Sequence, residues 1–264
     1  IRQFTEEGNL DMAFHSPDFD GSVYSIDVQP DGKIIIGGSF STVDGLSYSK
    51  ISRLTSTGFV DNTFKIGVGA NANVNAVKVL PDGGIIVGGS FISIDGYSAR
   101  RLAKLLPDGR LNREFSVGDG FNGPVSDIYL RVDGRLLVGG SFTRYDVSLQ
   151  NYIALLEKDG GVASNNLGKL NLNDTVYSVS EIAGGFVVVG GSFTRRDDLG
   201  YNYVAMVEGV SSMKPASLTI QQSVAGTSLN LTGEIGVTYV LEMSNDLIHW
   251  SKFSDAIVRS EEHT

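Results

Sequence analysis

The sequence contains no cysteine, which excludes disulfide bonds, thiolate zinc sites and cysteine nucleophiles. It has one tryptophan and only three histidines (His15, His249 and His263), which show neither metal-ligand spacing nor a recurring position. No apolar run approaches the length of a membrane span. Acidic residues outnumber basic ones, giving a net charge of −9, whereas nucleic-acid binding needs a basic face. The composition thus argues against thiol chemistry and nucleic-acid partners, and it assigns no activity.

Glycine, in contrast, is abundant, with 33 residues against six prolines. An apolar triplet followed by Gly-Gly-Ser-Phe occurs four times, beginning at Ile34, Ile85, Leu136 and Val187, so that each copy starts 51 residues after the previous one. A fixed period in this range is the signature of a repeat architecture. The chain is therefore expected to be an array of similar units.

Each repeat predicts a hairpin of two strands. The first strand, Val23–Val28 in the first copy, alternates in part between apolar and polar residues, as a half-buried strand does. A turn at Pro30-Asp31-Gly32 follows, in which Asp tolerates and Gly supplies the required conformation. The apolar triplet forms the second strand, and because it does not alternate it is expected to be buried on both faces. The first strand recurs at Val74–Val79, Val125–Leu130 and Val176–Glu181, and the turn at 81–83, 132–134 and 183–185.

A third strand carries Ile51 and Leu54, and it recurs at Leu102 to Leu105, Ile153 to Leu156 and Val204 to Val207. A short fourth strand is predicted to end at Phe64 and Phe115. The phenylalanine after each glycine pair is expected to fill the space between blades. Radially repeated sheets of three to four antiparallel strands form a β-propeller. The predicted fold class is therefore all-β: a β-propeller-type array of about four 51-residue blades, followed by a small partial β-sandwich module.

The run from Val23 to Phe40 closely resembles the core motif of the delta-60 repeat family, and Asp61–Phe64 resembles its closing segment. Kelch blades also carry a glycine pair, but they add a characteristic Tyr and Trp, and Trp250 lies outside the array. The resemblance extends from Ile1 to Glu208. It implies a bacterial, often extracellular, β-propeller-type repeat protein, and it brings no catalytic motif with it.

The predicted domains follow the repeats. They are a partial blade at 1–20, repeats at about 21–71, 72–122, 123–173 and 174–209, a linker at 210–217 and the partial β-sandwich module at 218–258. Tyr239–Trp250 resembles a module at the C-terminal end of large secreted bacterial proteins. Residues 259–264 resemble the translation of a sequencing adapter and are expected to be a non-native tail. Because the chain also opens inside a repeat, we expect a fragment of metagenomic origin.

Several recurring residues are candidates for binding. Four aspartates, each four residues after the motif phenylalanine, could form a ring of carboxylates that binds cations or sugars: Asp44, Asp95, Asp146 and Asp197. Two of them precede glycine, and the favoured interpretation is a local turn, as it is for Asp31, Asp82 and Asp133. Three arginines put positive charge on one set of loops, and five tyrosines could stack on sugars or pack inside: Arg144, Arg195, Arg196, Tyr24, Tyr145, Tyr177, Tyr201 and Tyr203.

The first glycine of each pair is predicted to be structural, because a phosphate-binding glycine loop would open a helix and carry a Lys-Ser/Thr. These glycines are Gly37, Gly88, Gly139 and Gly190. No catalytic, cofactor-binding or metal-binding residue is predicted, and no cofactor.

Three functions remain open. The favoured one is a non-enzymatic extracellular or cell-surface scaffold for interaction with, or adhesion to, a protein or glycan. The first alternative is a carbohydrate-active enzyme, a glycosidase or lyase. Its site would need unlike residues from different blades, and the fourth repeat departs most from the others, at Asn165, Asn166, Glu181, Arg195 and Arg196. The second alternative is a spacer array that carries a C-terminal sorting or attachment module.

Overall fold

The computed structural model describes residues 1–163, 167, 171–182, 185–194, 203–208, 217–223, 226–232, 238–243 and 251–257. The chain divides into two compact units. One comprises Ile1–Ile182 with Val187–Gly209, and the other Ala183–Phe186 with Val210–Thr264. Within the described residues, no helix has the length and apolar character needed to cross a bilayer.

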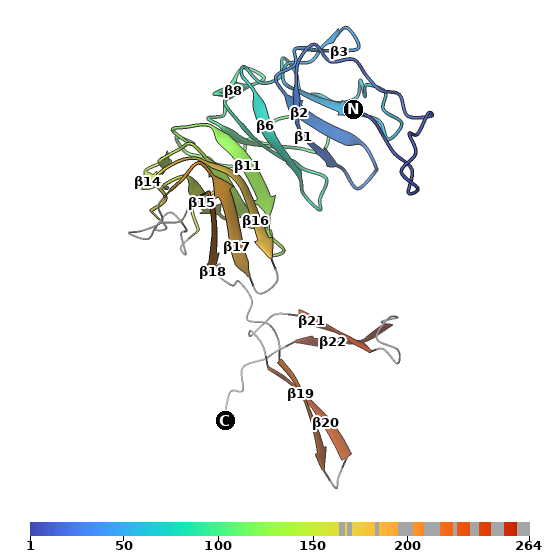
Figure 1. Cartoon of the computed structure of the whole chain (residues 1–264), viewed down its shortest axis with the longest axis vertical. Helices are drawn as coiled ribbons and strands as arrows, with labels where there is room; N and C mark the ends of the chain where they lie inside the picture. Colours follow the sequence, from blue (N-terminus) through green and yellow to red (C-terminus); the bar gives the residue numbers. More distant parts are fainter. Residues whose placement is uncertain are drawn as a thin grey trace. The chain divides into compact units, whose positions relative to one another are not determined.

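The first unit is all-β and is built from three-stranded antiparallel sheets that recur along the chain (Figure 1). The glycine-pair strand lies in the centre of each sheet. The sheets comprise β1 (Val23–Val28), β2 (Ile34–Gly38) and β5 (Ile51–Leu54); β6 (Val74–Val79), β7 (Ile85–Gly89) and β10 (Leu102–Leu105); β11 (Val125–Leu130), β12 (Leu136–Gly140) and β15 (Ile153–Leu156); and β16 (Val176–Ile182), β17 (Phe186–Gly191) and β18 (Val204–Glu208). The predicted all-β repeated-blade fold is thus confirmed.

Each of the first three blades also has a small hairpin that the sequence did not predict as strands. The hairpins are β3 (Thr42–Val43) with β4 (Leu46–Ser47), β8 (Ser93–Ile94) with β9 (Tyr97–Ser98), and β13 (Arg144–Tyr145) with β14 (Ser148–Leu149). The predicted fourth strand was wrong. In each of the first three blades it is reduced to a single bridge, such as Leu54 to Val60 and Leu105 to Leu111, because a tight turn brings the chain back across only one residue pair.

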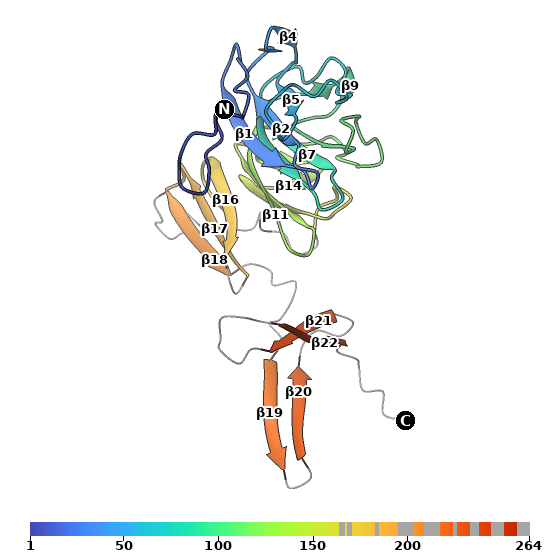
Figure 2. The same cartoon turned by 90° about the vertical axis from the view of Figure 1, so that its right-hand side faces the viewer.

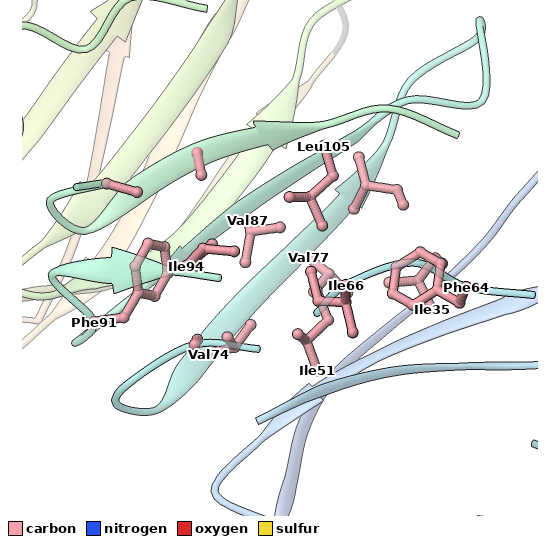
Figure 3. Close-up of a cluster of buried hydrophobic side chains, with 14 residues drawn as sticks. Ile35, Ile51, Phe64, Ile66, Val74, Val77, Val87, Phe91, Ile94 and Leu105 are labelled. Carbon is pink, nitrogen blue, oxygen red and sulfur yellow. The ribbon is translucent and has the colours of Figure 1, made fainter. Parts of the chain in front are cut away.

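Successive blades share hydrophobic cores. Ile35 and Ile51 of the first blade pack with Val77 and Phe91 of the second (Figure 3). Equivalent cores include Ile86 with Phe142 at the next junction, and Leu137 with Phe193 at the third. The motif phenylalanines are completely buried, as expected for side chains that fill the space between blades. The first strands β1, β6, β11 and β16 follow one another across the array (Figures 1 and 2).

The first glycine of each pair lets the next blade approach. A Cβ added at Gly88 would lie 2.6 Å from Val125 Cγ1 and 2.8 Å from Ile128 Cδ1 of the following blade. Gly37 and Gly139 meet the corresponding residues of their neighbours in the same way, at closest distances of 2.5 and 2.7 Å. None of these three glycines has a positive φ, so they are required for close approach and not for a left-handed backbone.

The same contact is absent at both ends of the described array. A Cβ at Gly190 would meet only one described atom, Tyr203 O, at 3.8 Å. Ile26 in β1 is 46 % exposed, whereas Val77 and Ile128, at the same position in the next two blades, are each 5 % exposed. For Gly190, the expectation of the same packing role as Gly37, Gly88 and Gly139 therefore stays a prediction.

The second unit contains two antiparallel strand pairs. β19 (Ser217–Ser223) pairs with β20 (Gly226–Thr232), and β21 (Thr238–Met243) pairs with β22 (Ser251–Ile257). Much of the Tyr239–Trp250 motif, including His249 and Trp250, lies outside the described residues, as do residues 259–264 with His263. The assignment of this region as a partial β-sandwich, and of 259–264 as non-native, stays a prediction.

Candidate functional site

The small hairpins are held by the aspartates that the sequence singled out. Asp44 and Gly45 form the two-residue turn between β3 and β4, and both have a positive φ, +50° and +75°. Asp95 and Gly96 repeat this geometry at +48° and +76°. Such two-residue turns match the twist of paired strands, and Asp-Gly is a preferred sequence for them. The interpretation as turns is therefore confirmed for the hairpin of each of these two blades.

The same carboxylates tie each hairpin to the loop that precedes its blade. Asp44 Oδ1 accepts a hydrogen bond from the Asp18 amide at 2.8 Å, Asp95 Oδ1 from the Val68 amide at 3.1 Å, and Asp146 Oδ1 from the Asp119 amide at 3.1 Å. Each aspartate is engaged with its own blade. Among the described residues, no three His, Cys, Asp or Glu side chains come together as a metal site would require. Asp197 lies outside the described residues.

A second repeated clamp was missed by sequence reasoning. Asp20 Oδ1 accepts hydrogen bonds from the Ser41 and Thr42 amides at 2.6 and 2.8 Å, and these bonds lower the pKa of Asp20. Asparagines occupy the same position in the next three repeats and accept from the equivalent amides: Asn71, Asn122 and Asn173. The signal was present in the sequence, as a short Asx side chain at the same 51-residue spacing.

These clamps connect the hairpins into one edge, which we call the hairpin rim: residues 41–49, 67–71, 92–100, 118–122 and 143–149. The Ala70 amide donates to Ser49 O of the first blade at 3.0 Å, and the Phe121 amide donates to Arg100 O of the second at 3.2 Å. The loops before the second and third blades thus each bond to two successive hairpins. Each loop donates to the aspartate of the hairpin that follows it and to a backbone carbonyl of the hairpin that precedes it. The rim is a continuous, hydrogen-bonded edge across three blades.

The hairpin rim exposes apolar side chains at corresponding places. Leu149 is 76 % exposed and Tyr97 47 %, and the others are likewise on the surface: Leu46, Val68, Ile92 and Val147. The Arg113 guanidinium lies 4.8 Å from the centre of the Tyr97 ring, a cation–π contact that holds the ring on the surface. Arg144 is also exposed. Single exposed apolar residues are ordinary, but their recurrence on one ordered edge makes the rim the candidate binding site.

His15 is the only described histidine, and it contacts the hairpin rim at Asp44. Its Nε2 lies 2.8 Å from Asp44 Oδ2, and its ring stacks on Phe59 with centroids 4.4 Å apart. Burial alone would raise the pKa of Asp44, but the bonds from the Asp18 amide and His15 outweigh it and lower the pKa. The contact joins the N-terminal segment to the first hairpin.

Two buried charges, Arg53 and Asp61, lie at the junction of the first two blades and bond to each other. Arg53 donates through Nε to Asp61 at 2.9 Å and through Nη1 to Pro107 O at 2.6 Å. Gln29 donates to Gly83 O at 2.7 Å. Burial would raise the pKa of Asp61, but bonds from Thr63 and Lys33 and the charge of Arg53 lower it from 3.8 to about 2. Such a shift can mark a functional group, yet Asp61 is buried and bonds to neighbouring side chains of its own blade, so we assign a structural role.

Glu181, which the enzyme alternative relied on, pairs with Arg131 across the junction of the third and fourth blades. Arg131 donates from Nε and Nη2 to the two carboxylate oxygens at 2.9 and 2.8 Å. The other residues of that alternative lie outside the described residues: Asn165, Asn166, Arg195 and Arg196.

The tyrosines divide between packing and exposure. Tyr145 is buried, donates to Gly160 O at 2.6 Å and has a raised pKa because of its burial. Tyr24, Tyr177 and Tyr203 are exposed and lie away from the hairpin rim, and Tyr201 lies outside the described residues.

Comparison with known proteins agrees with this geometry. Residues 29–64, 80–115 and 133–175 match a family model described as a domain of unknown function (DUF5122) beta-propeller. These three segments of the chain are thus similar to that β-propeller model. Each matched segment begins near the hairpin turn of its blade, and together the segments take in the glycine-pair strands β2, β7 and β12 and the hairpins of the rim. No curated protein matches the sequence.

Several solved structures are similar to this chain. One is the WD40 β-propeller domain of Doa1, with a TM-score of 0.43 and 13 % identity, covering 72 % of this chain and 74 % of that one. Two are extracellular domains from B. thetaiotaomicron. The domain of a protein described as a one-component system has a TM-score of 0.41 and 16 % identity, covering 88 % of this chain and 29 % of its own. The domain of a protein described as a hybrid two-component system has a TM-score of 0.41 and 11 % identity. The match covers 99 % of this chain and 36 % of that one. Likeness at this level says nothing about what the repeats of this chain bind.

Proposed function

We propose that this array is a non-enzymatic scaffold outside the cell that binds a protein or a glycan through the hairpin rim. The observation that carries the proposal is that the rim is ordered by repeated hydrogen bonds and yet leaves apolar side chains exposed in three consecutive blades. Exposed apolar surface on an ordered edge is typical of an interaction site.

The chemistry of the rim suggests its partner. Leu46, Val147 and Leu149 offer aliphatic surface, which matches the apolar centre of a protein interface. Tyr97, held by Arg113, offers the one aromatic face on which a sugar could stack. We therefore place a protein partner first and a glycan second. The location outside the cell is part of the proposal and rests on the resemblance of the sequence to delta-60 repeat proteins.

A matched pair of variants tests the proposal. The rim variant carries Leu46→Ser, Tyr97→Ser and Leu149→Ser, and the control carries Tyr24→Ser and Ile26→Ser in the exposed face of β1. Both sets replace exposed apolar residues, so both should unfold at the temperature of the parent within a few degrees. The measurement is binding to arrays of glycans and of purified bacterial and host surface proteins.

We expect the parent and the control to bind the same partner, and the rim variant to bind it at least tenfold more weakly. Equal binding by the rim variant would remove the rim as the site. If the protein turns over an arrayed glycan, and one substitution abolishes turnover without loss of binding, then the enzyme alternative would replace the scaffold hypothesis. The sorting-module alternative stays a prediction, which fusion of residues 210–258 to a reporter would test by the reporter's location.

A further inference from the structure

The three blade junctions differ at one position that recurs every 51 residues, occupied by Gln29, Leu80 and Arg131. At the first junction, Gln29 donates to Gly83 O of the next blade at 2.7 Å, and Arg53 beside it donates to Pro107 O at 2.6 Å. At the third junction, Arg131 and Glu181 form their paired hydrogen bonds at 2.9 and 2.8 Å. Long polar side chains therefore fill the space between blades at both of these junctions.

The second junction has different residues at these positions. Leu80 replaces the glutamine, Lys104 takes the place of Arg53, and Lys158 takes the place of Pro107. The junction contains a cleft of about 310 Å³ instead, at the lower end of the range for small-molecule sites. Its apolar lining comes from both blades: Leu80, Ile86, Leu130, Val132 and Leu136.

Of the charged side chains around this cleft, one lysine has no ion-pair partner among the described residues. Lys104 Nζ lies 3.6 Å from an oxygen of Asp82, and Asp133 is paired with Arg135 at 2.8 Å. Lys158 also lines the cleft and is exposed, and it makes no ion pair within the part of the chain that the structure describes. An apolar cavity with one uncompensated ammonium group matches a ligand that has an apolar body and a single negative charge.

We propose that the cleft between the second and third blades binds a small amphipathic monoanion, such as a medium-chain carboxylate. Its apolar body contacts Leu80, Ile86 and Leu136, and its carboxylate accepts a hydrogen bond from Lys158. The charge-assisted bond provides orientation, and burial of the apolar body provides most of the affinity. This site is separate from the hairpin rim and does not depend on the function proposed for it.

Titration with sodium octanoate tests the site, followed by amide chemical shifts of the full chain, with octylammonium as the probe of opposite charge. We expect saturable shifts at Leu80 and Gly134 with octanoate, and at least tenfold weaker binding of octylammonium. Lys158→Met should weaken octanoate binding at least tenfold, whereas Lys65→Met, an exposed lysine outside the cleft, should leave it unchanged. Leu80→Gln with Lys104→Arg and Lys158→Pro reproduces the residues of the first junction and should abolish binding.

Thermal unfolding of each variant establishes that it is folded, and Lys158→Met decides the question if the triple variant does not fold. Absence of saturable shifts in the parent, equal affinity for the two probes, or unchanged octanoate binding by Lys158→Met would each overturn the proposal.

Discussion

Replacing the first glycine of a pair by alanine should destabilise the array where a described following blade covers the glycine. In Gly88→Ala, the new methyl group would lie 2.6 Å from Val125 Cγ1 and 2.8 Å from Ile128 Cδ1 of the next blade. In Gly190→Ala, the nearest described atom would be Tyr203 O at 3.8 Å, an ordinary contact. Neither glycine has a positive φ, so backbone strain does not distinguish the two positions.

The magnitude follows from the terms that differ. Both substitutions restrict the unfolded chain, which stabilises the folded state by about 0.5–1 kcal/mol at either position. Only Gly88→Ala adds overpacking, which costs about 1–3 kcal/mol in a close-packed core. The free energy of unfolding of Gly88→Ala should therefore lie about 1–3 kcal/mol below that of Gly190→Ala, and Gly190→Ala should equal or exceed the parent.

Urea unfolding followed by far-UV circular dichroism measures this difference. Gly139→Ala is the internal control, since its methyl group would lie 2.7 Å from Val176 Cγ1, and it should behave like Gly88→Ala. If Gly190→Ala is as unstable as Gly88→Ala, or if Gly88→Ala and Gly139→Ala match the parent, then close approach of the next blade does not explain the glycines.

Three further predictions concern the charged and turn residues. Because the pKa of Asp61 is about 2 in the folded state against 3.8 ordinarily, stability should fall by about 2 kcal/mol between pH 5 and pH 2; urea unfolding against pH should show a flatter profile for Asp61→Asn. Arg131→Met should cost about 3 kcal/mol by leaving Glu181 unpaired, and adding Glu181→Met should recover most of the loss in a thermal double-mutant cycle. Asp95→Asn should cost under about 0.5 kcal/mol, because Asn keeps the acceptor and tolerates the φ of +48°, whereas Asp95→Val should cost about 1–2 kcal/mol.

The sequence predicted the main sheets well because their signal is strong. The apolar triplet and the alternating strand before it recur at one spacing, and β1, β6 and β11 have the predicted bounds. The small hairpins were missed as strands because two-residue strands such as Thr42–Val43 are too short to show a hydrophobic period. Their turns were still predictable, since Asp-Gly at Asp44-Gly45 demands a positive φ.

The candidate site was less accessible to sequence reasoning. That Asp44 and Asp95 support turns followed from local chemistry, but the amides they bind belong to loops 26 and 27 residues away. The exposure of Leu149 depends on the position of its hairpin relative to the rest of the blade. The local sequence of the hairpin does not reveal that position. Likewise, the contrast between Gln29 and Leu80 becomes meaningful only when the residues opposite them, across a blade junction, are known.

Native-state hydrogen exchange tests most directly the central claim that each blade is held by its packing on the next through the glycine-pair strand. The amides of β7 and β12, whose first glycines are covered by a following blade, should exchange only through global unfolding. The amides of β17, where no described residue of a following blade covers Gly190, should exchange at least tenfold faster. Equal protection of all three strands, or faster exchange in β7 and β12 than in β17, would contradict the account.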